Sequence, residues 1–168
     1  MKKFISMLLA GTMALSLCGC NNTQAPAPEV SQVEESGETV VLSEDEMLTR
    51  IQGWWYMMYE DSNDCFAIHF SGRDVLETMY PGEKFPDGVI TGMTQIEENV
   101  FEVEIYYPET ELFGEVYPES TDTYTLISDN GFQNDMVMVT EDGTELVFQY
   151  AGFTESEFET VYYETIRK

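Results

Sequence analysis

The strongest constraint on the fold of this 168-residue chain is the spacing of its apolar residues, which recur at every second position. Between 101 and 107 the apolar residues alternate with Glu102 and Glu104, and segments 65–70 and 146–150 repeat the alternation. A period of two is typical of a strand with one buried face, because successive side chains of a strand point to opposite sides. The pattern predicts an all-β domain.

Tight-turn sequences separate these alternating segments. Asp129-Asn130-Gly131 and Asp142-Gly143 supply residues that adopt positive φ at little cost, as hairpin turns require, and Ser71-Gly72 and 61–64 are of the same kind. Eight or nine consecutive antiparallel strands of this sort form either a sandwich or an up-and-down barrel, and closure removes exposed edges. We expect the barrel, with strands near 53–60, 64–70, 73–80, 88–96, 99–107, 121–128, 134–140, 144–150 and 158–166.

A short helix is expected immediately before the first strand. Ser43 and Glu46 have the spacing of a capping box, in which each side chain bonds the other residue's backbone N–H. The pair predicts a helix from about 44 to 51 that leads into a single domain at 43–168.

The first predicted strand opens with Ile51-Gln52-Gly53-Trp54-Trp55, a Gly-x-Trp motif after a helical turn. With the predicted meander behind it, this opening resembles that of the lipocalins and related calycin barrels. The resemblance implies that Gly53 lets the chain enter the barrel tightly and that Trp55 closes one end. It also implies a basic side chain from the last strand packed across the Trp55 ring, a contact worth about 1 kcal/mol, for which Arg167 is the candidate.

The resemblance concerns the fold rather than the ligand. Other signature motifs of the family are not recognisable, and the chain does not end in the Arg-x-Tyr pair of fatty-acid-binding relatives. As a whole the chain resembles small lipocalin-like domains on lipoproteins of Gram-positive gut bacteria, which are mostly of unknown function.

The first residues have the organisation of an export signal. Lys2 and Lys3 precede an apolar run over 4–17, which is shorter than the roughly 20 residues that span a bilayer stably. We therefore expect 1–19 to be a signal peptide that is removed from the mature protein.

The end of this segment, Leu17-Cys18-Gly19-Cys20, resembles the lipobox of bacterial lipoproteins, although Ser, Ala or Thr is more usual where Cys18 stands. The resemblance implies cleavage before Cys20 and lipidation of its sulfur, with acyl chains such as palmitate. Two or three chains anchor a protein stably where one does not. The implied location is the extracytoplasmic face of a cell membrane, and the alternative is an ordinary secretory signal with Cys20 unmodified.

Residues 20–42 are expected to form an acidic, disordered tether, because this segment is rich in Pro, Ala, Ser and Glu and contains almost nothing that can pack. The whole chain has a formal charge of −25, and loss of Lys2 and Lys3 would leave five basic against 32 acidic residues, a charge of −27. This excess opposes binding to nucleic acid and to anionic lipid headgroups. Membrane attachment is therefore expected through the acyl chains alone. The charge itself serves solubility and extension or, alternatively, recognition of a cationic partner.

The interior of a small barrel is either filled by side chains or open to one small ligand. Apolar and aromatic residues at inward positions suit both a pocket and an ordinary core. The candidate pocket residues are Met57, Tyr59, Phe66, Ile68, Phe70, Phe101, Val103, Ile105, Tyr124, Met136, Met138 and Phe148. The connection over 108–120 carries apolar residues among Glu and Pro, and it is expected either to act as a lid or to cap the core. The candidate lid residues are Leu112, Phe113 and Tyr117.

No catalytic, cofactor or metal motif is recognisable. A single histidine, His69, does not suffice for the usual zinc sites, and no nucleophile elbow or phosphate-binding loop is present. Cys65 and His69 lie on one face of a predicted strand but about 13 Å apart at the usual rise per residue, so a structural thiol is expected. The chain is therefore expected not to be an enzyme.

Two roles remain open. The first is non-catalytic binding of a small apolar or amphipathic ligand inside the barrel. The second is a surface interaction or structural module with a fully packed barrel, whose partner is a cell-surface protein that docks on the acidic wall or the 108–120 loop. A cavity of a few hundred Å³ that opens near this loop would favour the first role.

Overall fold

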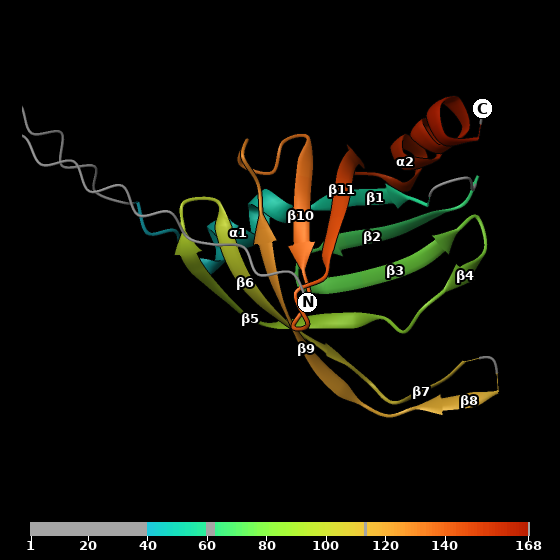
Figure 1. The fold of residues 1–168 in the computed structure, drawn as a ribbon, viewed down its shortest axis with the longest axis horizontal. Coiled ribbons are helices and arrows are strands. Elements are labelled where there is room, and N and C mark those ends of the chain that lie inside the picture. Colours follow the sequence, from blue (N-terminus) through green and yellow to red (C-terminus); the bar gives the residue numbers. More distant parts are fainter. Residues whose placement is uncertain (1–39, 60–62, 113, 168) are drawn as a thin grey trace, which may run out of the picture. The chain divides into compact units, whose positions relative to one another are not determined.

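The computed structural model of the chain describes residues 40–59, 63–112 and 114–167. Eight of its strands form one closed antiparallel barrel (Figure 1), in which neighbouring strands follow one another along the chain and the last pairs with the first. The barrel strands are β1 (Gly53–Met58), β2 (Cys65–Ser71), β3 (Asp74–Tyr80), β5 (Gly88–Glu97), β6 (Val100–Tyr107), β9 (Ser120–Ile127), β10 (Asp135–Val139) and β11 (Glu145–Gly152). The expected up-and-down barrel is confirmed. The predicted signal peptide, Cys20 and the predicted tether as far as residue 39 lie outside the described residues.

Three short strands stand outside the ring. β4 (Glu83–Lys84) pairs with Thr78 and Met79, near the C-terminal end of β3. β7 (Thr110–Leu112) and β8 (Glu115–Tyr117) form a separate hairpin within the 108–120 connection. Figure 1 shows this hairpin extending from the ends of β6 and β9. The described part of the connection thus forms a two-stranded projection at one end of the barrel.

The opposite end of the barrel, here called the closed end, is covered by the helix α1 (Glu44–Ile51). Ser43 and Glu46 form the expected capping box, so the predicted helix is confirmed. Its apolar face contributes Met47, Leu48 and Ile51 to the core that fills the barrel. The Gln52 side chain after the helix accepts a hydrogen bond from the backbone N–H of Gly72 at 2.6 Å and so ties α1 to the β2–β3 turn.

The prediction of a ninth strand over 158–166 is wrong. Residues Glu155–Val161 form the helix α2, and Tyr162–Ile166 continue it as a π-helical segment. Thr154 and Glu157 make a second capping box at its start. The buried residues Phe158, Tyr162 and Ile166 recur every four positions, which is a helical spacing rather than the period of two first assigned to them.

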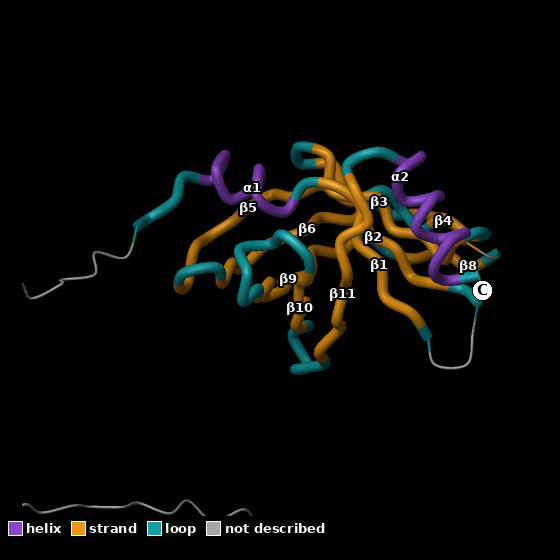
Figure 2. Tube along the Cα trace, turned by 90° about the horizontal axis from the view of Figure 1, so that it is seen from above, coloured by secondary structure: helices purple, strands orange, loops and turns teal. Residues whose placement is uncertain are grey.

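This C-terminal helix covers the outer face of the first two strands. Trp54 and Tyr56 on β1 and Cys65 and Ala67 on β2 are apolar and buried although they point away from the barrel interior. Together with Ala151, Phe158, Tyr162 and Ile166 they form a second core, here called the outer cluster. Figure 2 shows α2 outside the barrel on the side of β1, β2 and β3. Within the part of the chain that the structure describes, no helix is long and apolar enough to span a membrane.

Candidate ligand pocket at the barrel mouth

The end opposite α1, here called the mouth, contains a pocket of about 370 Å³. Residues 81–87, 108–119 and 140–144 connect the strands at this end. Aromatic, proline and aliphatic side chains make up most of the pocket wall, with two carboxylates among them. The lining residues are Glu77, Phe85, Pro86, Tyr107, Pro108, Leu112, Tyr117, Pro118, Ser120, Asp122 and Tyr124.

The pocket lies where the barrel wall separates. β3 and β5 pair only through Asp74 with Val89 and through Val75 with Gly88, whereas β6 and β9 stay paired as far as Tyr107 and Ser120. β3 pairs with β2 along its whole length, and beyond Val75 its other edge pairs only with β4, through Thr78 and Met79. The β6–β9 pair and β3 therefore diverge toward the mouth, and the space between them is bridged by side chains rather than by a backbone ladder.

The absence of a side chain at Gly88 leaves room for the central aromatic ring of the pocket, that of Tyr107. A Cβ added at Gly88 would lie 2.8 Å from Cε1 of Tyr107 and equally close to Cγ2 of Ile105, well inside van der Waals contact. The Tyr107 ring therefore packs directly over the backbone of β5. This position directs its hydroxyl across the gap, where it donates a hydrogen bond of 2.5 Å to Oε1 of Glu77.

Glu77 is an acidic residue at an inward position of the barrel. Its partner on β2 is Ile68, and its neighbours on the same face of β3 are Val75 and Met79. Burial raises the pKa of its carboxyl group, and the negative charge of Asp122 raises it further, while the hydrogen bond from Tyr107 acts in the opposite direction. The carboxyl group is thus held in a poorly solvated pocket with a second acidic group nearby.

The two tyrosines beside Glu77 remain protonated hydrogen-bond donors across the physiological range. Burial, first, and the charge of Glu77, second, raise the pKa of Tyr107 far above its usual range. The same two causes raise the pKa of Tyr124 to about 12. The polar centre of the pocket therefore consists of two phenol groups and two carboxyl groups, from Tyr107, Tyr124, Glu77 and Asp122.

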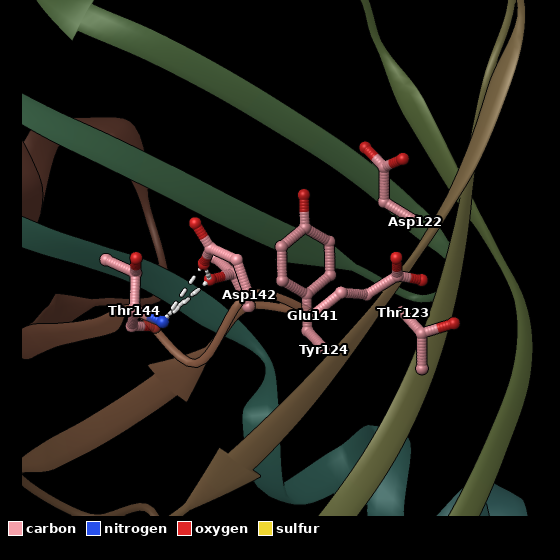
Figure 3. Close-up of a pocket in the computed structure, with 7 residues that line it drawn as sticks. Asp122, Thr123, Tyr124, Glu141, Asp142 and Thr144 are labelled. Atoms are coloured by element: carbon pink, nitrogen blue, oxygen red, sulfur yellow. Dashed lines mark hydrogen bonds between the residues drawn. The ribbon is translucent and has the colours of Figure 1, made fainter.

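A second, polar hollow of about 390 Å³ adjoins this pocket and shares Asp122 and Tyr124 with it (Figure 3). Its other side is the β10–β11 turn, where the Asp142 carboxylate accepts hydrogen bonds from the Thr140 hydroxyl at 2.5 Å and the Thr144 backbone N–H at 3.1 Å. These bonds lower the pKa of Asp142 and use its carboxylate to hold the turn. Among the described residues, no group of three or more His, Cys, Asp or Glu side chains could hold a metal ion.

The structure brings three of the predicted pocket and lid residues to the mouth pocket, namely Tyr124, Leu112 and Tyr117. Phe113 lies outside the described residues. Most of the other candidates belong instead to the packed core, and Met57 and Phe66 pack against it while partly buried. Tyr59 follows the end of β1 and is 43 % exposed. The core members are Ile68, Phe70, Phe101, Val103, Ile105, Met136, Met138 and Phe148.

Sequence reasoning missed the polar half of the site, Glu77 and Asp122 together with Tyr107. The sequence does contain a signal that Glu77 belongs to a site. Glu77 occupies the inward position between Val75 and Met79, where an apolar residue is usual. A charged residue that interrupts the buried face of a strand requires a partner or a function.

The residues implied by the lipocalin resemblance lie at the closed end, with one exception. Trp55 is completely buried, donates from Nε1 to the carbonyl of Ile51 at 2.8 Å, and meets the Tyr150 ring edge-on. Gly53 has a φ of +109°, and a Cβ there would lie 2.7 Å from the Gly152 carbonyl oxygen. Arg167 is the exception: it follows the C-terminal helix and lies over the Tyr163 ring at 5.8 Å, because the expected last strand is a helix.

Cys65 and His69 both lie on the outward face of β2, beside α2. Cys65 is buried and free, and burial raises the pKa of its thiol to about 11. His69 stacks on Trp54 with ring centroids 4.5 Å apart, and burial lowers the pKa of its imidazole. A thiol with a raised pKa is a poor nucleophile at neutral pH, which fits a structural thiol.

Comparison of the chain with protein-family models, with curated proteins and with solved structures gave no match. The closed eight-stranded antiparallel barrel is consistent with a lipocalin-like fold. It is compatible with a binding role and with a structural role.

Proposed function

We propose that this protein is a lipid-anchored, extracytoplasmic binding protein that takes a small amphipathic ligand in the mouth of a lipocalin-like barrel and performs no catalysis. The observation that carries the proposal is the pocket of about 370 Å³ bounded by the 108–120 connection. Its volume lies within the usual range for small-molecule sites, and its wall combines a largely apolar lining with a few convergent polar groups.

The arrangement of the barrel supports binding at one end only. Between the closed end and the mouth pocket, the barrel interior is filled by buried side chains such as Phe70, Phe101 and Phe148. At the mouth, Leu112 and Tyr117 of the β7–β8 hairpin lie on one side of the pocket and Phe85 lies on another. A ligand would therefore rest on the core and be covered by the hairpin.

The anchor is proposed from the lipobox-like sequence that ends at Cys20. Replacing the sulfur by the oxygen of serine removes the acyl acceptor, so Cys20→Ser is expected to release the protein into the medium or to leave it unprocessed. Metabolic labelling with a clickable palmitate analogue, followed by fractionation, measures both outcomes. Continued labelling and membrane retention of the variant would refute the anchor and leave the pocket unaffected.

Native mass spectrometry of the full chain purified from its own host tests the binding role directly. We expect a small molecule to accompany the protein and to be lost when the pocket is filled by Ser120→Trp, since Ser120 lines the pocket. Thr121→Trp is the matched control, because Thr121 is the next residue of the same strand and its side chain points to the outside of the barrel. Absence of any bound molecule, or equal loss from both variants, would favour the alternative of a barrel that serves as a surface interaction or structural module.

A further inference from the structure

Among the residues that the structure describes, no cationic side chain pairs with the carboxyl group of Glu77 in the pocket. The groups that act on it are the phenol of Tyr107 and the negative charge of Asp122. An ionised carboxylate in a poorly solvated site is unfavourable unless it is paired, so the site favours either a bound proton or a bound cation.

None of the described lysine and arginine residues lines the pocket, and Arg167 lies over the Tyr163 ring. Arg73 pairs with Glu44 at 2.9 Å, and Arg50 donates to Asn99 at 2.8 Å. Both lie at the closed end. Lys84 lies opposite Thr78 in the β3–β4 register, one residue from Glu77. Because successive residues of a strand face opposite sides, the Lys84 side chain is on the outer face, away from Glu77.

The remaining pocket wall suits a positive charge on an apolar body. The rings of Phe85, Tyr107, Tyr117 and Tyr124 line the same space as the two carboxyl groups. Aromatic faces attract cations through their quadrupole, and groups of such rings recognise substituted ammonium ions. The chain's formal charge of −25 also raises the local concentration of cations and repels anions.

We propose that the mouth pocket binds an organic cation, a primary or substituted ammonium carried on a small apolar body. The ammonium group lies between Glu77 and Asp122, and the apolar body packs against Phe85, Leu112 and Tyr117. This inference rests on the proposed ligand-binding function and assigns the chemical class of its ligand.

The pocket also makes binding depend on pH. Glu77 must be ionised to pair with the cation, and burial together with Asp122 raises its pKa, while Tyr107 and Tyr124 stay protonated. Affinity for a cation is therefore expected to rise with pH until Glu77 has lost its proton and then to level off. Affinity for a neutral ligand of the same shape lacks this dependence.

Three probes of similar size and different charge test the inference: 2-phenylethylammonium, 2-phenylethanol and 3-phenylpropanoate. The full chain is held in lipid nanodiscs, with empty nanodiscs as the blank, and each probe is titrated by ligand-observed NMR. We expect the ammonium to bind about tenfold more tightly than the alcohol at neutral pH, and the carboxylate to bind most weakly.

Glu77→Gln keeps the shape of the side chain and removes its charge. This variant is expected to bring the affinities for the ammonium and the alcohol to within about threefold of each other. Glu102→Gln is the matched control, because Glu102 is exposed on the outer face of β6, and it should leave the preference intact. Thermal melting shows whether each variant is folded, and Asp122→Asn replaces Glu77→Gln if the latter is not.

The outcomes separate the two proposals. Equal binding of the ammonium and the alcohol, or a preference that survives Glu77→Gln (or Asp122→Asn where it replaces that variant), overturns the inference and leaves the binding function standing. Binding of none of the three probes, together with the absence of any host molecule in native mass spectrometry, overturns both.

Discussion

The two ends of the barrel are built from opposite chemistry. At the closed end, α1 and Trp55 contribute buried apolar surface, and the one polar atom of the Trp55 ring donates to Ile51. At the mouth, Glu77 and Asp122 lie in a partly open pocket whose carboxyl groups repel each other. One end therefore stabilises the fold, while the other retains polar groups that a stable core would exclude. This contrast is the reason why the ligand site is proposed at the mouth.

The largest effect is expected from truncating the closed end. Trp55→Ala removes a completely buried side chain and its hydrogen bond, and it should lower the free energy of unfolding by about 3–5 kcal/mol. Tyr117→Ala at the mouth truncates a ring that is 45 % exposed and should change this free energy by less than about 0.5 kcal/mol. Urea denaturation followed by far-UV circular dichroism measures both. Equal losses would contradict the contrast between the two ends.

A smaller effect is expected where the pocket meets the barrel wall. Gly88→Ala places a Cβ 2.8 Å from the Tyr107 ring, so the ring must move, at a cost of about 1–3 kcal/mol, and its hydrogen bond to Glu77 should lengthen. Gly92→Ala on the same strand is the control, because the nearest atom to its Cβ is the flexible carboxylate of Glu104, 3.0 Å away. Denaturation together with probe titration distinguishes the two. A loss of stability without loss of binding would show that Tyr107 does not position the pocket.

The cap of α1 has a more modest role at the closed end. Ser43→Ala removes the side-chain acceptor for the backbone N–H of Glu46 and should cost about 1 kcal/mol. Thr154→Ala makes the equivalent change at α2, outside the barrel. Hydrogen exchange should show faster exchange in α1 only for the first variant, without an effect on ligand affinity. A change in affinity after Ser43→Ala would mean that the two ends are coupled.

The sequence predicted the barrel because hairpin turns and alternating residues act locally, and it predicted α1 because a capping box needs only Ser43 and Glu46. It failed at α2, where aromatic and β-branched residues such as Phe158, Val161 and Tyr162 have strand propensity, and packing on the outer cluster decides in favour of a helix. The capping pair Thr154 and Glu157 is the local sequence signal that indicates this helix.

The site was less predictable than the fold, for a physical reason. Residues Glu77 and Tyr107 are 30 positions apart in the sequence, and they meet only because β3 and β5 separate after two residue pairs. The register at which two strands stop pairing depends on the whole barrel and has no local pattern. The candidate lid residues Leu112 and Tyr117, which line the pocket, were recognisable because apolar residues are unusual in a long acidic connection.

The smallest expected effect concerns Glu77, and here the substitution should raise the stability of the fold rather than lower it. Because its folded-state pKa is raised above the ordinary value of 4.5, its ionisation destabilises the native state as pH rises from that value to the folded value. Glu77→Gln, which does not titrate, should therefore match the wild type in stability near pH 3 and exceed it at neutral pH. Urea denaturation at both pH values, with Glu102→Gln as the control, measures the difference.

Bound ligand should reverse the greater stability of Glu77→Gln at neutral pH. Saturating 2-phenylethylammonium stabilises only the protein that binds it, by an amount that grows with the logarithm of its concentration over the dissociation constant. The wild type should thus regain stability at neutral pH, while Glu77→Gln should gain little. A variant that is less stable than the wild type at neutral pH without ligand would mean that the Glu77 carboxylate, like Trp55, stabilises the fold, and the two ends of the barrel would then differ less than their chemistry indicates.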